Sequence, residues 1–368
     1  MTNVYCIRPK GLNVGNEAIH VALRHQLNRA FGEPVNIINV PATSRYESHA
    51  KAGFTPATVH EMNQYADGVV VGGGNLYENG ELDVDVNALR ALEAPLMLYS
   101  LSMGRIANRR GELVRRTDSM PDAVIVALHE RANLSLARDL ATVEHLSHAG
   151  AEAQLGGCPT LFIDQTPQHV IAEASVADGA VLVSVRTPDL MSVPLQRRIR
   201  VRDDVERILE LARETAGGPV KLLCHDHRDI PFAASFAGVE YLYTDDVYLY
   251  LSLLRRARLC IGYRLHAVLP CLAFGTPVVK ISYDERGNSM MRTIGLDGWN
   301  IDMLVVDDVV AEVRRRTEQL DELDALKGAA QSRWSELETV QRNAMDEFAE
   351  LVQRYRDRDA RALVSPRN

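Results

Sequence analysis

The chain has 368 residues, 46% of them hydrophobic and 24% charged, which is an ordinary globular composition at a length that predicts two domains. Its formal net charge of −8, from 41 Lys plus Arg against 49 Asp plus Glu, argues against nucleic acid as a partner, because a broad phosphate-binding surface needs a net basic face. The five cysteines form no C-x-x-C pair, MTNVYCIRPKG carries no signal peptide, and no window approaches the roughly 20 apolar residues of a membrane span, so we expect a cytoplasmic protein.

The amino-terminal part opens with an expected strand at 4–7 and an expected helix at 15–31. Asn13 can cap this helix, Gly15 allows another group to approach the backbone closely, and Glu17 places a carboxylate in the first turn. Two interpretations are open: an ordinary helix start, or one wall of a ligand-binding cleft.

Strands and helices continue to alternate through this half, which predicts a doubly wound parallel sheet. Gly73 and Gly74 directly follow one strand and precede Asn75, so a ligand or another backbone can come close there. This stretch either lines a cleft or forms a tight loop, and Tyr77 stands where a dinucleotide-binding fingerprint would need a glycine. The strands expected here are 35–40, 67–71, 96–100 and 123–127.

A second series of strands begins after the segment 164–178, which contains Pro167 and lacks periodicity. Arg186 follows the first of these strands and His225 the second, so both are expected at the carboxyl edge of a parallel sheet, where ligands bind. His225 and His227 form an H-x-H pair without a third ligand nearby, and we expect no metal. The strands expected here are 180–185, 220–223, 240–242, 258–261 and 278–281.

The segment 258–286, RLCIGYRLHAVLPCLAFGTPVVKISYDER, is typical of a strand, a tight turn, a helix and a second strand. Gly262 precedes Arg264 and His266, which stand at the helix start, and Tyr283 follows the second strand. A helix N-terminus carries free N–H groups and about half a positive charge. The segment therefore predicts an anion-binding site.

The pattern R-L-H-A, a run to G-T-P, and then I-S-Y-D resembles the polysaccharide pyruvyltransferase family. The resemblance implies an α/β fold of the GT-B type, with two Rossmann-like domains facing a central cleft. It also implies a transferase of polysaccharide biosynthesis that joins the pyruvyl group of phosphoenolpyruvate to two hydroxyls of a sugar as a cyclic ketal. Phosphoenolpyruvate is then a co-substrate, no further cofactor is expected, and the acceptor saccharide is small, polymeric or lipid-linked.

The resemblance assigns roles to the candidate site residues. His266 is the catalytic proton carrier, because the ordinary pKa of histidine lies near neutrality. The residues implied for donor binding are Arg186, Arg264, Arg286, His225 and Tyr283. The residues implied for the acceptor side are Asn13, Gly15, Asn16, Glu17, Gly73, Gly74 and Asn75.

Two positions depart from the family pattern. Asn16 stands where the family typically has Asp and cannot act as a base, so Glu17 would have to take that role. Arg286 stands where the family typically has Lys, and it keeps the positive charge without being able to donate a proton. The departures point to an unusual acceptor or to lost activity.

We expect an acceptor domain over 1–163, a linker over 164–178, a donor domain over 179–306, and carboxyl-terminal helices over 307–368. The last helix, with Trp334 among its spaced apolar positions, is expected to pack back across both domains.

Two basic clusters occur, one over 109–116 and one over 197–202. They are either solvated surfaces or a docking surface for an anionic glycan or lipid head groups. The second interpretation implies peripheral contact at the inner face of the membrane.

Two other functions share this architecture, because a fold alone does not set a function. A glycosyltransferase that uses nucleotide sugars would place Asp284 or Glu285 on the ribose hydroxyls and the helix at Arg264 on the diphosphate. A degenerate protein would bind a glycan or anion without turnover.

Overall fold

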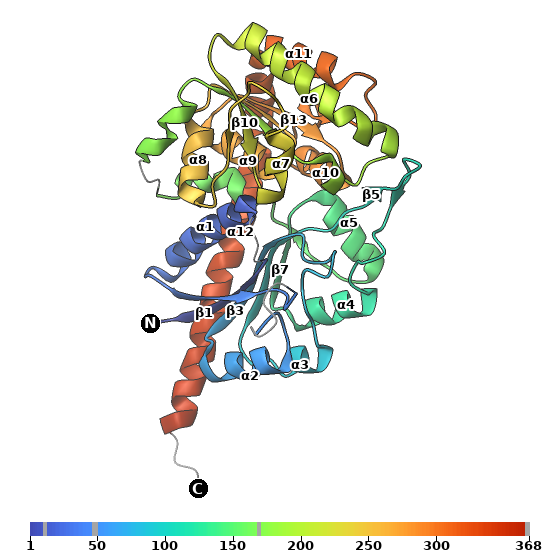
Figure 1. Cartoon of the computed structure of the whole chain (residues 1–368). Coiled ribbons are helices and arrows are strands. Elements are labelled where there is room, and N and C mark those ends of the chain that lie inside the picture. The colour runs from blue at the N-terminus through green and yellow to red at the C-terminus, as the bar shows by residue number, and fades with distance from the viewer. Residues whose placement is uncertain (10–12, 46–50, 168–170, 365–368) are drawn as a thin grey trace.

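The computed structural model describes residues 1–9, 13–45, 51–167 and 171–364. Two parallel six-stranded sheets lie one above the other, each flanked by helices (Figure 1). The strand order is β2-β1-β3-β4-β7-β8 in the first sheet and β11-β10-β9-β12-β13-β14 in the second. In each sheet the first strand in the chain lies inside, so the order reverses beside it, and ligands of doubly wound sheets bind at such reversals. The two predicted Rossmann-like halves are confirmed.

The first sheet consists of β1 (Asn3–Arg8), β2 (Asn36–Pro41), β3 (Gly68–Gly74), β4 (Leu96–Leu101), β7 (Leu134–Ala137) and β8 (Gln154–Leu155). An antiparallel hairpin pairs β5 (Ile106–Ala107) with β6 (Leu113–Val114). The helices of this half are α1 (Val14–Phe31), α2 (Pro56–Tyr65), α3 (Val86–Arg90), α4 (Asp122–Arg131) and α5 (Leu140–Ala149). Two 3-10 helices, η1 (Pro159–Gln165) and η2 (Ala172–Ala177), lead to the second sheet.

The second sheet consists of β9 (Val181–Val185), β10 (Val220–Cys224), β11 (Tyr241–Leu242), β12 (Leu259–Gly262), β13 (Val278–Ser282) and β14 (Ile301–Asp302). Its helices are α6 (Leu195–Ala216), α7 (Ile230–Ala233), α8 (Val247–Arg256), α9 (Leu265–Phe274), α10 (Glu285–Thr293) and α11 (Val309–Glu318), and α12 (Leu320–Val364) follows them. Short 3-10 turns are η3 (Pro188–Leu190), η4 (His227–Asp229) and η5 (Asp297–Trp299).

The strand predicted at 123–127 is wrong, because these residues belong to helix α4. Pro121 holds the N-cap position of α4, and Ile125 and Leu128 are buried on one face of the helix. The β-branched run in this stretch favours a strand, but burying one helical face outweighs that propensity. The strand of this unit is β7, and Arg138 directly follows its carboxyl end.

Helix α1 joins the two halves through both of its faces. Val14, Ala18 and Ile19 pack into the core of the second half, whereas Leu23 and Leu27 pack on the first sheet. The start of α1 therefore packs on the second half, while its later turns pack on the first sheet.

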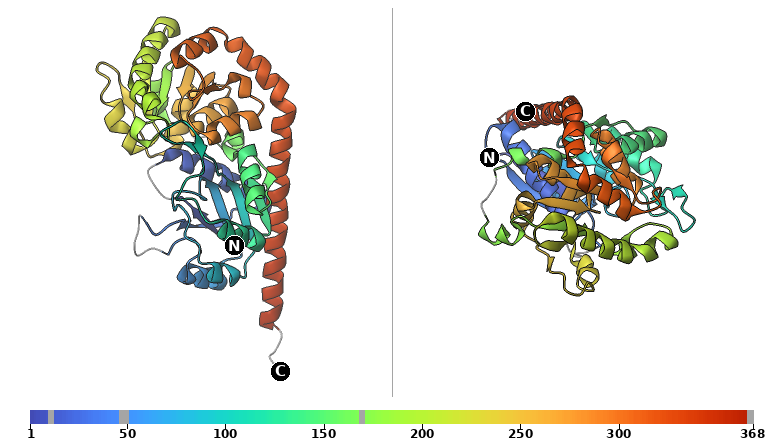
Figure 2. Two further views of the ribbon diagram at one scale, coloured as in Figure 1. Left: turned by 90° about the vertical axis from the view of Figure 1, so that its right-hand side faces the viewer. Right: turned by 90° about the horizontal axis from the view of Figure 1, so that it is seen from above.

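Helix α12 spans 45 residues and runs along both halves (Figure 2). The indole Nε1 of Trp334 donates to the carbonyl of Ile294 in the second half at 2.8 Å, and Gln341 Nε2 donates to the carbonyl of Gly156 at 2.7 Å. Phe348 is fully buried on the first sheet. The prediction that the last helix packs back across both halves is confirmed. Within the described residues, no helix is both long enough and apolar enough to cross a membrane.

Candidate active site between the two sheets

Arg264 occupies the N-cap position of α9, with φ −97° and ψ 126°, so its main chain is extended while His266 already lies in the first helical turn. The Arg264 side chain belongs to a residue only 8% exposed. In the part of the chain that the structure describes, no carboxylate and no hydrogen-bond acceptor pairs with its guanidinium. A buried cation is stable when an anion compensates it. Arg264 is thus a buried cation at a helix start, where an anion would compensate its charge.

His266 and His225 stack beside the start of α1. Their ring centroids lie 6.3 Å apart with an interplanar angle of 17°. A Cβ on Gly15 would lie 2.2 Å from Nε2 of His225 and 2.8 Å from Nδ1 of His266, so only glycine lets α1 approach both rings. His225 Nδ1 lies 2.7 Å from the Tyr250 hydroxyl, and His266 Nε2 lies 3.7 Å from Cys158 Sγ. The two rings therefore lie between Gly15 of α1 and their partners Tyr250 and Cys158.

Burial disfavours the charged form of both imidazoles. Burial, followed by the charges of Arg138 and Arg264, lowers the pKa of His266 to about 3. Burial also lowers the pKa of His225 well below its usual range, with Arg264 adding to the effect. The expectation that His266 titrates near neutrality is therefore wrong for the ligand-free chain. A bound anion would offset the arginine charges and raise the pKa of His266 again.

Arg186 follows β9 and faces the same region. Its Nη1 lies 3.4 Å from Oδ1 of Asp229 and 3.7 Å from Oδ2 of Asp226, while its Nε is buried without a hydrogen-bond partner. Burial lowers the pKa of Arg186, and the nearby charge of Arg264 lowers it further. The structure therefore brings Arg186 and Arg264 together, as the sequence predicted.

Arg138 comes from the first sheet and was missed by the sequence reasoning. It is 4% exposed, donates to Ser102 Oγ, and holds Nε 3.4 Å from Oδ2 of Asp139. Its charge acts on His266, so it lies beside the second-half residues. Its position directly after β7 could have identified it in the sequence. The prediction of a strand at 123–127 in place of β7 obscured that position. We call the five residues His225, His266, Arg138, Arg186 and Arg264 the histidine–arginine cluster.

Arg286 is compensated within the protein, in contrast to Arg264. Its Nη2 lies 2.6 Å from Oδ2 of Asp284, and its Nη1 lies 3.1 Å from Oε2 of Glu78, a residue of the first half. Burial opposes its charge, but these two carboxylates raise the pKa of Arg286. Arg286 therefore links the two halves, and a role in donor binding stays a prediction.

Tyr283 directly follows β13, and its ring lies near Lys280 of that strand. Lys280 Nζ lies 5.9 Å from the Tyr283 ring centroid and donates to the carbonyl of Tyr263 at 3.1 Å. Burial lowers the pKa of Lys280 to about 7, although Asp284 opposes this. This lysine is thus the group of the site region whose own charge changes near neutral pH.

The residues predicted for the acceptor side gather around the start of α1. Asn13 caps α1 by accepting a hydrogen bond from Gly15 N at 3.0 Å and forms a backbone bridge with Asp226 of the second half. A Cβ on Gly74 would lie 3.7 Å from Oδ1 of Asn16, so the glycine-rich segment adjoins this helix start.

Three further acceptor-side residues have distinct surroundings. Glu17 is paired with Arg8 at 2.7 Å, which makes it a weak substitute for a free base. Gly73 has φ +66°, and a Cβ there would lie 2.4 Å from Ile19 Cγ2, so this glycine is needed for packing. Asn75 Oδ1 is buried without a hydrogen-bond partner in the described structure, which leaves it free to accept from a ligand.

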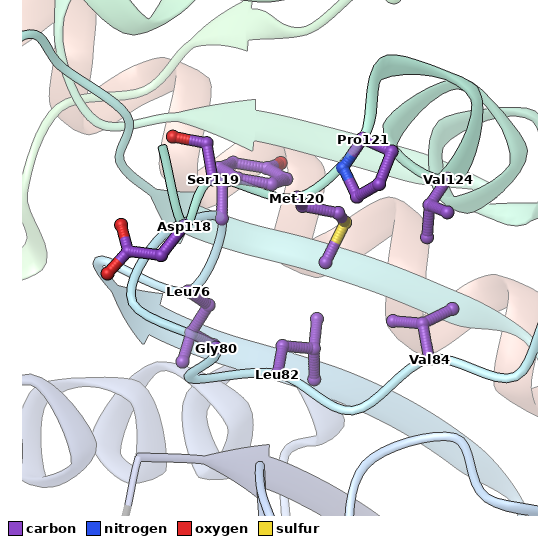
Figure 3. Close-up of a pocket in the computed structure, with 10 residues that line it drawn as sticks. Leu76, Gly80, Leu82, Val84, Asp118, Ser119, Met120, Pro121 and Val124 are labelled. Carbon is purple, nitrogen blue, oxygen red and sulfur yellow. The ribbon is translucent and has the colours of Figure 1, made fainter. Parts of the chain in front are cut away.

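A cavity of about 250 Å³ opens in the first half, between the loop after Asn75 and the start of α4 (Figure 3). It is lined by Leu76, Tyr77, Gly80, Leu82, Val84, Asp118, Ser119, Met120, Pro121 and Val124. None of these side chains is cationic, so the cavity suits an apolar group rather than an anion. The cavity shares no lining residue with the histidine–arginine cluster.

The side chains of His225 and His227 lie in different surroundings. His225 is buried against Tyr250, whereas His227 is exposed and lies 3.3 Å from Oδ1 of Asp226. Across the described ranges, no group of three His, Cys, Asp or Glu residues is arranged to hold a metal ion.

Solved structures with a similar fold act on nucleotide sugars. The UDP-N-acetylglucosamine 2-epimerase from Rickettsia bellii is 11% identical with a TM-score of 0.55, and the match covers 93% of this chain and 98% of that one. The enzyme from Neisseria meningitidis bound to UDP-GlcNAc is 11% identical with a TM-score of 0.54, covering 96% and 98%. These similarities establish the GT-B fold that the sequence predicted. A search of curated protein sequences finds no match.

The family model for polysaccharide pyruvyl transferase matches residues 13–285. This range runs from the cap of α1 through β13 and includes the whole histidine–arginine cluster. It covers the larger part of the chain and agrees with the resemblance carried by the segment 258–286. The chain is a member of the polysaccharide pyruvyl transferase family.

Proposed function

We propose that the chain transfers the pyruvyl group of phosphoenolpyruvate to two hydroxyls of a sugar, forming a cyclic ketal and releasing inorganic phosphate. The observation that carries this proposal is Arg264, a buried cation that pairs with no group of the described residues, beside His266 at the start of α9. Membership of the family supplies the reaction class, and the cluster supplies a site of matching charge.

Phosphoenolpyruvate carries a phosphate and a carboxylate, and three arginines belong to the cluster: Arg138 and Arg264 act on His266, and Arg186 acts on His225. Arg264 and Arg186 come from the second half, and Arg138 comes from the first. Guanidinium groups bind such anions through paired, charge-assisted hydrogen bonds. We assign the phosphate and carboxylate of the donor to these three side chains.

The chemistry needs two additions to one carbon. The first acceptor hydroxyl adds to the carbon that bears the phosphate ester oxygen and loses its proton, while the methylene carbon gains a proton and becomes a methyl group. The bond to the phosphate oxygen then breaks and phosphate leaves with its electron pair. The second hydroxyl adds to the same carbon and loses its proton, which the phosphate can carry away.

His266 is placed to move these protons. Because it is neutral without ligand, it can accept the proton of the attacking hydroxyl. A bound dianion raises its pKa, so the protonated ring becomes a competent acid for the next transfer. His225 stacks on it and is fixed by Tyr250, which positions the pair. The acceptor then lies on the side of Asn13, Asn16 and Asn75.

A nucleotide-sugar donor is the second candidate, because the fold neighbours include structures bound to UDP-GlcNAc. The geometry favours it less. Glu285 is bonded by Arg105 at 2.8 Å and by His145 at 2.7 Å, and Asp284 is paired with Arg286. Neither carboxylate is free to bind ribose hydroxyls.

We place the reaction in the cytoplasm, with a lipid-linked acceptor presented at the inner face of the membrane.

Isothermal titration calorimetry tests the donor. Phosphoenolpyruvate should bind the native chain, and Arg264→Ala should weaken binding about 10- to 100-fold, because a charge-assisted hydrogen bond contributes about 1.5–3 kcal/mol. Arg207→Ala, which removes an exposed arginine paired with Asp308, is the matched control and should bind normally. Binding of UDP or GDP in place of phosphoenolpyruvate would overturn the donor assignment.

Turnover is tested by phosphate release with a panel of sugars that carry neighbouring hydroxyls. His266→Ala should keep donor binding and lose turnover by about 10²- to 10⁴-fold, the usual contribution of a positioned acid or base. Donor binding without phosphate release for any sugar would favour a degenerate binding protein.

A further inference from the structure

The two basic clusters of the sequence come together in space, although they lie in different halves. A Cβ on Gly111, at the tip of the β5–β6 hairpin, would lie 3.5 Å from Cγ of Pro194, which precedes α6. Figure 1 shows the hairpin reaching up beside this end of α6. We call the exposed residues within 106–114 and 195–202 the hairpin–helix patch.

The patch exposes large aliphatic side chains. Leu195 is 57% exposed and Ile199 is 68% exposed, and they lie one turn apart on the same face of α6. Leu113 on β6 is 43% exposed. These side chains gain nothing from water, and they belong to the two segments that Gly111 and Pro194 bring together.

The same patch is basic, although the whole chain is acidic. Of the four arginines in residues 195–202, Arg200 and Arg202 are exposed, whereas Arg197 and Arg198 are half-buried and donate to the carbonyls of Val306 and Met191. In the described structure, Arg109, Arg110 and Arg200 are exposed and form no ion pair, whereas Arg115 is paired with Asp122. The net charge of −8 therefore hides a local surface of opposite sign.

We propose that the hairpin–helix patch docks the protein on an anionic lipid bilayer. Leu195, Ile199 and Leu113 would enter the boundary between head groups and acyl chains, while the arginines bind lipid phosphates around them. A glycan would be bound by aromatic faces, and residues 106–114 and 195–202 contain no aromatic side chain. The proposal does not depend on the reaction, and it would bring the site close to acceptors that are carried on lipids.

Vesicle co-sedimentation of the full chain tests the proposal. The chain should sediment with vesicles of phosphatidylcholine mixed with phosphatidylglycerol and stay in solution with phosphatidylcholine alone, and added salt should weaken binding. The double change Arg109→Gln and Arg110→Gln should lower affinity about 25-fold, since each arginine near such a surface contributes about fivefold. The double change Leu195→Ser and Ile199→Ser should lower it at least as much.

Matched controls remove the same side-chain types elsewhere. Tyr65→Ser removes a side chain from a residue 64% exposed on α2, and Arg354→Gln removes an exposed arginine on α12, and neither should change binding. All the altered residues are exposed, so circular dichroism should show normal folding. The proposal is overturned if the chain ignores anionic vesicles, binds both lipid mixtures equally, or binds undiminished after both double changes.

Discussion

The contact between Gly15 and the two histidines allows a sharp test by Gly15→Ala. The added methyl group would meet His225 Nε2 at 2.2 Å and the Cβ of His266 at 2.8 Å, both closer than real side chains come. Either the start of α1 must move away from the second half or both rings must turn. The change thus disturbs the site without removing any of its functional groups.

The size of the effect follows from two opposing contributions. Alanine favours a helix over glycine by about 0.8–1.0 kcal/mol. Overpacking a tight contact costs about 1–3 kcal/mol. The free energy of unfolding should therefore fall by about 0–2 kcal/mol, whereas turnover should fall about 100-fold, because a displacement of about 1 Å at a reacting group has that effect.

Gly328→Ala is the matched control, since Gly328 lies inside α12 and a Cβ there would meet nothing within 4 Å. It should raise the free energy of unfolding by about 1 kcal/mol and leave turnover unchanged. Urea denaturation and phosphate release measure the two quantities. If Gly15→Ala matched Gly328→Ala in stability and kept full turnover, the packing of α1 on the histidines would be refuted.

Three further predictions concern charged groups. Arg264→Met should raise the free energy of unfolding by about 1–3 kcal/mol in urea while weakening donor binding about 10- to 100-fold, because it removes a buried cation that no described carboxylate compensates; a loss of stability would contradict this. Burial opposes the charge of Glu285, but hydrogen bonds from His145 and Arg105 lower its pKa to about 2. Glu285→Gln should destabilise the chain by about 2 kcal/mol at pH 7, and in pH-dependent melts the deficit should vanish as the pH falls from about 4.3 toward about 2. The pKa of His266 is lowered to about 3, so the native chain should lose stability as the pH falls below the unfolded pKa of about 6.5, where only the unfolded chain takes up the proton. The His266→Gln variant should lose less stability than the native chain over this pH range. Equal losses would argue against a neutral buried ring.

Local signals in the segment 258–286 were sufficient to predict its structure. Gly275 ends α9 with φ +74°, as expected for a glycine after a helix, and β12 and β13 flank the helix as parallel neighbours. Arg186 and Arg264 both follow parallel strands, whose carboxyl ends meet at one edge of the sheet, so their proximity could be predicted from strand order alone. Such features depend on neighbours in sequence or on strand direction, and both can be inferred from a pattern.

Contacts across the two halves could not be predicted in this way. Arg286 pairs with Glu78 across 208 positions, so its compensation is invisible in the sequence, and Arg264 looked equivalent to it. The pKa of His266 is lowered by burial first and then by the charge of Arg138, a residue that the wrong strand at 123–127 had hidden. Burial and partner charges decide these properties, and they follow only from the packed structure.

The position of α12 has a consequence for how the protein is made. The face of the first sheet formed by β1, β3 and β4 is covered by Met345, Phe348 and Val352, which lie far beyond the second sheet in the chain. During synthesis, the first half therefore leaves the ribosome with this apolar face covered only in part, by Leu23 and Leu27 of α1, and the rest stays bare while the whole second half is translated. Folding of the half made first can be completed only after the segment around Phe348 has emerged, so a chaperone has its longest opportunity to bind at that face.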